Sequence, residues 1–142
     1  MDLSELRKLD AYLKRLFSNP RLRVVPRPQK QDLAEVYGGE ELLGILTLDD
    51  EDEDRSYNFR MEIPLGPSSN EDIQRLNAYL RAKLGSERIR VVARTKKRDS
   101  FEAYVGDEFV GVLFIDEKRG ARSCILEMAI LDVDLEDSAA AP

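Results

Sequence analysis

The feature that most constrains the fold of this chain is an internal repeat. When the 142-residue sequence is shifted by 67 positions, residues 9–65 align with residues 76–132 without a gap, and 22 of the 57 aligned positions are identical. Two unrelated segments of ordinary composition would share roughly three or four identities over this length. The sequence therefore predicts two copies of one small unit. The predicted boundaries are residues 1–65 for the first repeat, 66–70 for a linker, 71–137 for the second repeat and 138–142 for a flexible tail.

Each repeat is predicted to begin with a helix. Apolar side chains recur at helical spacing over residues 6–17 and again over residues 73–84, which gives each helix one apolar stripe. Asp2 and Ser69 stand just before these segments, and each is followed three residues later by an acid. This spacing is typical of a helix N-terminal cap, with the second pair a weaker variant of the capping box.

Four short antiparallel strands are expected after each helix, because apolar residues recur between turn-forming glycines and prolines. Pro26 and Pro28 place the first strand at an edge of its sheet or end it there. The third strand is apolar at nearly every position, which predicts that both of its faces are covered. Gly44 and Gly111 lie inside that strand, where a bulge or a close backbone approach is the usual reason. The predicted strands are Arg21–Arg27, Ala34–Tyr37, Leu42–Leu48 and Tyr57–Ile63, then Arg88–Arg94, Phe101–Val105, Phe109–Ile115 and Cys124–Ile130.

The fold class that follows is α+β, with two α-β-β-β-β units, one helix on each antiparallel sheet and a pseudo-twofold relation between the units. One helix covers only one face of a sheet, so the other face needs a second layer. The sister repeat is the expected partner, because a unit of about 65 residues buries only about 60% of its unfolded surface on its own. We expect a pseudo-dimer within one monomeric chain, its sheets packed face to face or joined edge to edge.

Several of these segments together resemble one small family. The chain looks like two tandem copies of a bacterial domain of about 70 residues known as domain of unknown function 3126, and the family name implies no activity. The first repeat departs from the pattern at Thr47, where an aromatic strand residue is expected, and the second replaces an acidic loop with Glu117–Gly120. The segments that carry the resemblance are Arg23–Pro28, Ala34–Tyr37, Asp49–Phe59, Val105–Phe114 and Met128–Leu135.

The composition excludes several kinds of catalytic and metal site. The chain has no histidine and one cysteine, Cys124, so an intramolecular disulfide, a Ser-His-Asp triad, a Cys/His dyad and histidine-containing zinc sites are ruled out. Cys124 falls on the apolar side of the last strand and is predicted to be an inert core thiol. The acid pairs Glu40–Glu41 and Asp107–Glu108 lie in predicted turns, where exposed acids are routine. We therefore expect no enzyme activity, no cofactor and no metal.

The N-terminal sequence lacks the basic and apolar regions of an export signal. The longest apolar run, Phe109–Ile115, is far shorter than the roughly 20 residues that span a bilayer. We expect a cytoplasmic protein in a reducing setting, without a membrane segment.

Charge is segregated along each repeat although the net charge is only −6. The local net charges are +7 over residues 7–30, −9 over 31–66, +8 over 75–98 and −8 over 99–142. The acidic run Asp49–Asp54 lacks the glycine and the twelfth-position Glu of an EF-hand loop. It is predicted to be a solvated hairpin loop.

The first strand of each repeat carries arginines on one face, and these are the candidate residues for binding a partner or an anion. Either they meet phosphates or an acidic partner, or they pair with acids of their own or the sister repeat. We expect a noncatalytic protein-interaction or adaptor module, with RNA or DNA binding through these arginines as the alternative. The net charge and the lack of an aromatic-rich basic motif disfavour nucleic acid. The six arginines are Arg21, Arg23, Arg27, Arg88, Arg90 and Arg94.

Overall fold

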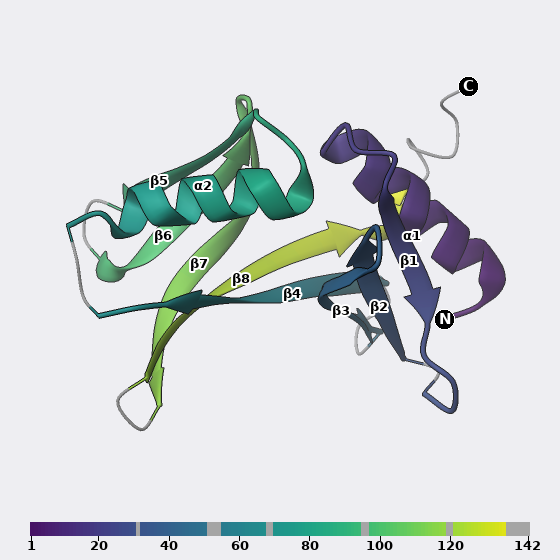
Figure 1. The fold of residues 1–142 in the computed structure, drawn as a ribbon. Coiled ribbons are helices and arrows are strands. Elements are labelled where there is room, and N and C mark those ends of the chain that lie inside the picture. The colour runs from purple at the N-terminus through teal and green to yellow at the C-terminus, as the bar shows by residue number, and fades with distance from the viewer. Residues whose placement is uncertain (31, 51–54, 68–69, 95–96, 119–120, 136–142) are drawn as a thin grey trace.

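The predicted order of elements, one helix and four strands repeated twice, is confirmed in the computed structural model (Figure 1). The structure describes residues 1–30, 32–50, 55–67, 70–94, 97–118 and 121–135. The predicted tail 138–142 and most of the acidic run lie outside these residues. The first repeat contains α1 (Leu3–Leu16), β1 (Leu22–Pro26), β2 (Leu33–Gly38), β3 (Glu41–Asp49) and β4 (Ser56–Leu65). The second contains α2 (Asp72–Leu84), β5 (Ile89–Arg94), β6 (Lys97–Val105), β7 (Glu108–Lys118) and β8 (Ala121–Leu131).

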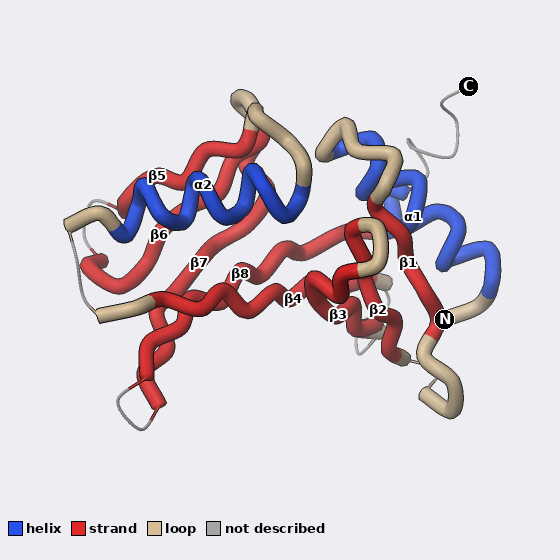
Figure 2. The backbone as a smooth tube through the Cα atoms, viewed as in Figure 1, coloured by secondary structure: helices blue, strands red, loops and turns tan. Residues whose placement is uncertain are grey.

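The two repeats join edge to edge in one antiparallel sheet. Its strand order is β1-β2-β3-β4-β8-β7-β6-β5, so the last strand of each repeat pairs with the last strand of the other. The face-to-face alternative is therefore wrong. Both helices lie on one side of this sheet, which curves up around them (Figure 2), and their leucine stripes belong to one continuous core. We call this covered side the inner face and the opposite side the outer face.

A pseudo-twofold axis passes through the centre of the sheet. Arg60 in β4 pairs directly with Glu127 in β8, and these two residues occupy equivalent positions of the repeats. The register continues outward from this pair in matching steps on both sides, as expected for an axis perpendicular to the sheet. The outer-face row that crosses all eight strands is Val25, Glu35, Ile45, Arg60, Glu127, Val112, Glu102 and Val92.

The core lies between the inner face and the helices. Phe59 and Met61 of β4 and Met128 of β8 are at most 1% exposed, because their strands alternate between faces and this face meets the helices. The expectation that the third strand is covered on both faces is wrong. Leu46 on the inner face is buried, but Ile45 on the outer face is partly exposed, since edge-to-edge joining leaves the outer face to solvent.

The glycine inside each third strand is required by a close backbone approach, as predicted. A Cβ atom at Gly44 would lie 2.4 Å from the carbonyl oxygen of Arg60, and one at Gly111 would lie 2.4 Å from that of Glu127. Real Cβ atoms are not found this close to a carbonyl. The third and fourth strands therefore approach each other closely at the same point in both repeats.

Side chains from the helices block the two outer edges of the sheet. β1 is an edge strand, as its prolines predict, and β5 is the other edge. The edge N–H of Val24 donates to Asp10 Oδ1 of α1 at 2.9 Å, and the equivalent Val91 N–H donates to Asn77 Oδ1 of α2 at 2.9 Å. Asn77 Nδ2 also donates to the Val91 carbonyl at 3.3 Å. An added strand would find these edge groups already bonded.

Candidate functional site

A row of three side chains crosses β1, β2 and β3 on the outer face of the first repeat. The Arg23 guanidinium lies over the Tyr37 ring, with its carbon 5.0 Å from the ring centroid. The guanidinium also donates to the Gly39 carbonyl through Nε at 3.1 Å and Nη2 at 2.8 Å. Leu42 pairs with Tyr37 across the strands and is 47% exposed. The turn thus fixes the arginine over the tyrosine, beside an exposed apolar side chain.

The second repeat carries the same row at equivalent positions. The Arg90 carbon lies 5.0 Å from the Tyr104 ring centroid, and Nε donates to the Gly106 carbonyl at 3.1 Å. Phe109 packs edge-on against Tyr104, with ring centroids 5.7 Å apart, and is 51% exposed. Within the described residues neither Arg23 nor Arg90 forms an ion pair. We call these two sets the Arg-Tyr rows.

The other four predicted arginines are held in three different ways. Arg21 and Arg88 lie against the turn glycines Gly39 and Gly106, where a Cβ atom would be 2.5 Å and 2.3 Å from their Nη2 atoms. Arg27 pairs with Glu35 of its own repeat at 3.1 Å. Arg94 donates to Ser100 Oγ at 3.1 Å.

The structure does not bring the six arginines into one site. They form two sets of three at opposite ends of the sheet, because β1 and β5 are its two edges. Within the described residues one of the six, Arg27, forms an ion pair with an acid, and this acid belongs to the same repeat. Whether the remaining arginines bind a partner stays a prediction.

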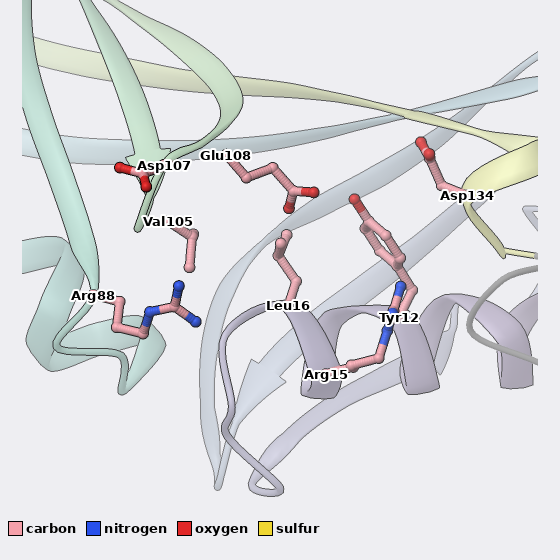
Figure 3. Close-up of a pocket in the computed structure, with 8 residues that line it drawn as sticks. All are labelled: Tyr12, Arg15, Leu16, Arg88, Val105, Asp107, Glu108 and Asp134. Carbon is pink, nitrogen blue, oxygen red and sulfur yellow. The ribbon is translucent and has the colours of Figure 1, made fainter. Parts of the chain in front are cut away.

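A polar crevice opens where the end of α1 meets the β6–β7 turn of the sister repeat (Figure 3). Its volume is about 520 Å³. The carboxylates of Asp107, Glu108 and Asp134 lie in the upper part of the view, and the guanidinium groups of Arg88 and Arg15 lie below them, on either side of Leu16. Burial, then the nearby Asp134 and Glu108 carboxylates, raise the pKa of Tyr12 to about 12, so its hydroxyl keeps its proton at neutral pH. The lining residues are Tyr12, Arg15, Leu16, Arg88, Val105, Asp107, Glu108 and Asp134.

The pseudo-twofold axis generates a sister crevice between α2 and the β2–β3 turn. Its volume is about 300 Å³. Lys83 Nζ bridges it with an ion pair to Glu41 Oε2 at 2.6 Å, and Asn19 Nδ2 donates to the Leu84 carbonyl at 2.9 Å. The hydrogen bond from Lys83 to Glu41 raises the pKa of the lysine. Two links therefore cross this crevice, one from α2 to β3 and one from the α1–β1 loop to the end of α2.

Sequence reasoning missed both crevices, because it sought function in what the two repeats share. Arg15 stands where the second repeat has Ala82, and Leu16 stands where it has Lys83. A comparison of the repeats for charge differences would have singled out these positions.

The duplication seen in the fold also appears in comparison with known sequences. Residues 5–64 and again residues 72–134 match the model of one family, described as Protein of unknown function (DUF3126). The chain belongs to this family, in two tandem copies. Comparisons with curated proteins and with solved structures found no match.

The two DUF3126 repeats share an ion pair that anchors the start of the helix to the last strand. Arg55 Nε lies 3.1 Å from Glu5 Oε2 in the first repeat, and Arg122 Nη2 lies 2.6 Å from Asp72 Oδ2 in the second. The Tyr57 hydroxyl adds a hydrogen bond to Glu5 in the first repeat. Burial and this bond raise the pKa of Tyr57.

Cys124 occupies the place of Tyr57 in the second DUF3126 repeat. It is fully buried, and burial followed by the nearby Asp72 carboxylate raises its pKa to about 12. A thiol with this pKa stays protonated and unreactive at neutral pH, as predicted for an inert core residue. Asp72 Oδ1 is buried without a hydrogen-bond partner among the described residues, whereas the corresponding oxygen of Glu5, Oε1, accepts from the Asp2 N–H.

The outer faces of the two DUF3126 repeats differ near the centre of the sheet. Phe114 and Ile125 pair across β7 and β8, where the first repeat pairs Thr47 with Asn58. The outer face of the second repeat is consequently the more apolar one.

Metal-ligand clusters and membrane-spanning helices are both absent from the described residues. No group of three or more His, Cys, Asp or Glu side chains is arranged to hold a metal ion there. No helix in that part of the chain is long and apolar enough to cross a membrane.

Proposed function

We propose that this protein is a noncatalytic, cytoplasmic protein-interaction module that binds its partner through the Arg-Tyr rows of the outer face. The observation that carries the proposal is the repetition of Arg23, Tyr37 and Leu42 as Arg90, Tyr104 and Phe109. In both repeats the arginine lies over the tyrosine ring and its Nε donates to the carbonyl of the turn glycine. Exposed arginine and aromatic side chains are enriched where partners contribute most binding energy.

The fold supports the outer face over other surfaces. The helices cover the inner face, and Asp10 and Asn77 occupy the backbone groups at the sheet edges, which opposes binding by strand addition. Among the described residues no helix covers the outer face, and Leu42 and Phe109 are about half exposed there. Exposed apolar side chains beside oriented polar groups are typical of an interface.

The chemistry of the rows indicates what a partner presents. Gly39 holds Nε and Nη2 of Arg23, so the guanidinium already has the orientation needed to receive a carboxylate through its remaining N–H groups. Leu42 and Phe109 offer apolar contacts next to these groups. An acidic protein segment with interspersed apolar residues fits both features.

The test is affinity capture with the full chain, comparing it with a double variant, Arg23→Glu and Arg90→Glu. Reversing both charges repels an acidic partner, so proteins captured specifically by the wild type should be lost with this variant. A second double variant, Arg7→Glu and Arg75→Glu, changes the same net charge at exposed helix positions and should retain them. Equal capture by all three forms would contradict the proposal.

Nucleic-acid binding is the competing outcome of the same experiment. An arginine stacked on a tyrosine also suits a base, although Glu35 and Glu102 lie on neighbouring rows of the same face. Salt-dependent retardation of RNA or DNA that disappears with the Arg23→Glu and Arg90→Glu variant would favour this alternative and overturn the protein-binding proposal.

A further inference from the structure

The two crevices between the repeats provide a comparison within one molecule. Both lie between a helix C-terminus of one repeat and the second hairpin turn of the other. They are related by the pseudo-twofold axis, so most of their lining positions are equivalent, but Asp134 comes from the segment after β8 and lines only the larger crevice. The differences between them therefore show which crevice is closed by its own residues and which is left open.

The crevice of about 300 Å³ is closed by polar links between its walls. Lys83 and Glu41 form an ion pair across it at 2.6 Å, and Asn19 bonds to the end of α2. At the equivalent positions the larger crevice has Leu16, Glu108 and Ser86. Leucine offers no charge to Glu108, and Glu108 forms no ion pair with a described residue. The larger crevice therefore lacks the ion pair that joins the walls of the smaller one.

The larger crevice also contains an arginine side chain that the smaller one lacks. Arg15 replaces Ala82 and stands on the same side of the view as Arg88, which comes from the other repeat (Figure 3). Both arginines are exposed, and neither pairs with an acid among the described residues. The facing side carries Asp107, Glu108 and Asp134. Asp134 also accepts a bond from the Leu131 N–H at 3.0 Å.

We propose that this crevice is a binding site for a small zwitterion, either a free α-amino acid or a short peptide. Arg15 and Arg88 receive its carboxylate, and Glu108 with the neighbouring acids receives its ammonium group. The Tyr12 hydroxyl adds a neutral donor on the acidic side. The volume of about 520 Å³ falls within the range of small-ligand pockets.

The balance of charge favours a dipolar ligand over a simple ion. Three carboxylates would repel a phosphate or another multivalent anion that approached the arginines, and two guanidinium groups would repel a polyamine that approached the acids. A ligand with both charges satisfies both sides at once. This inference does not depend on the Arg-Tyr rows, because the crevice lies between the repeats and uses other side chains.

The experiment is an NMR titration of the full chain with the dipeptide Ala-Ala, followed through backbone amide shifts. N-acetylated Ala-Ala lacks the ammonium group, and Ala-Ala amide lacks the carboxylate. We expect Ala-Ala to shift amides around Leu16, Arg88 and Glu108, and both capped peptides to bind roughly tenfold more weakly, since each loses a charge-assisted contact.

Two variants convert the crevice to the state of its sister. Arg15→Ala removes the added cation, and Leu16→Lys introduces the residue that pairs with the turn acid in the other repeat. Each should weaken Ala-Ala binding roughly tenfold, while Lys83→Leu, which opens the sister crevice, should leave it unchanged. Wild-type amide spectra outside the crevice verify folding of each variant.

Three results would overturn the proposal. The first is the absence of shifts up to about 10 mM Ala-Ala, beyond the range of useful affinity. The second is equal binding of Ala-Ala and its acetylated form, which would indicate an anion site. The third is binding that neither Arg15→Ala nor Leu16→Lys weakens, which would place the peptide elsewhere.

Discussion

At the scale of single residues, the acid at the start of each helix is bound to the last strand by a different number of contacts. Glu5 accepts from both Arg55 and the Tyr57 hydroxyl, whereas Asp72 has Arg122 but no hydroxyl, because Cys124 replaces the tyrosine. The sequence correctly predicts the capping box of Asp2 with Glu5, which forms in both directions. It also assigned Asp72 to a cap with Ser69, which lies outside the described residues. In the structure Glu71 holds the cap position without a side-chain bond.

This difference predicts unequal effects of removing the two arginines. Arg122→Ala should lower the free energy of unfolding by about 3 kcal/mol, because it leaves the Asp72 carboxylate buried and without a counter-charge. Arg55→Ala should cost about 1 kcal/mol or less, since Arg55 is 43% exposed and Tyr57 still donates to Glu5. Urea unfolding followed by circular dichroism measures both values. Similar losses in the two variants would contradict the assigned difference between the sites.

At the scale of elements, the sequence predicted the edge position of β1 but not how that edge is protected. Prolines exclude a strand from the sheet interior, and this signal is local. Asp10 and Asn77 instead occupy polar positions of their helices, where a solvent-facing side chain is the ordinary expectation. Their bonds to β1 and β5 depend on how each helix packs beside its edge strand. The sequence alone contains no such distance information.

We expect the variant Asn77→Ala to expose the β5 edge. It frees the N–H and carbonyl of Val91, which should lower stability by about 1–2 kcal/mol and promote self-association through the unprotected edge. Analytical ultracentrifugation at increasing concentration measures the association. Gln74→Ala, at an exposed position of the same helix, is the matched control and should associate no more than the wild type. An Asn77→Ala protein that associates no more than the wild type would show that this bond does not protect the edge.

At the scale of the whole molecule, the sequence established the duplication but left two ways to join the repeats. The alternation of apolar and polar residues in β4 and β8 predicts that each strand has one buried face. This pattern is the same whether the edge of the strand pairs with another strand or stays free. The apolar third strand misleadingly favoured a second layer. The deciding feature is the central register, in which Arg60 faces its own equivalent, Glu127, at 3.4 Å. Two identical chains would place like charges at this point.

A charge exchange at the axis tests this register. Arg60→Glu alone and Glu127→Arg alone should each destabilise the protein by about 0.5–1 kcal/mol, because like charges then face each other across the strands. The double variant carrying both exchanges should recover most of the loss. A double-mutant cycle from thermal or urea unfolding gives the coupling free energy. Additive losses in the double variant would show that the two side chains do not interact.

The central β4–β8 ladder also sets an order of events during synthesis. Its pairs run from Leu65 with Arg122 to Ser56 with Leu131, so they join residues 57 to 75 positions apart in the chain. The first repeat leaves the ribosome with the edge of β4 that later pairs with β8 still open along ten residues. At roughly 5–20 residues per second, several seconds pass before β8 emerges to cover it. During that interval Arg60 and Glu62, the exposed charges in the middle of β4, are the residues that we expect to oppose pairing between nascent chains.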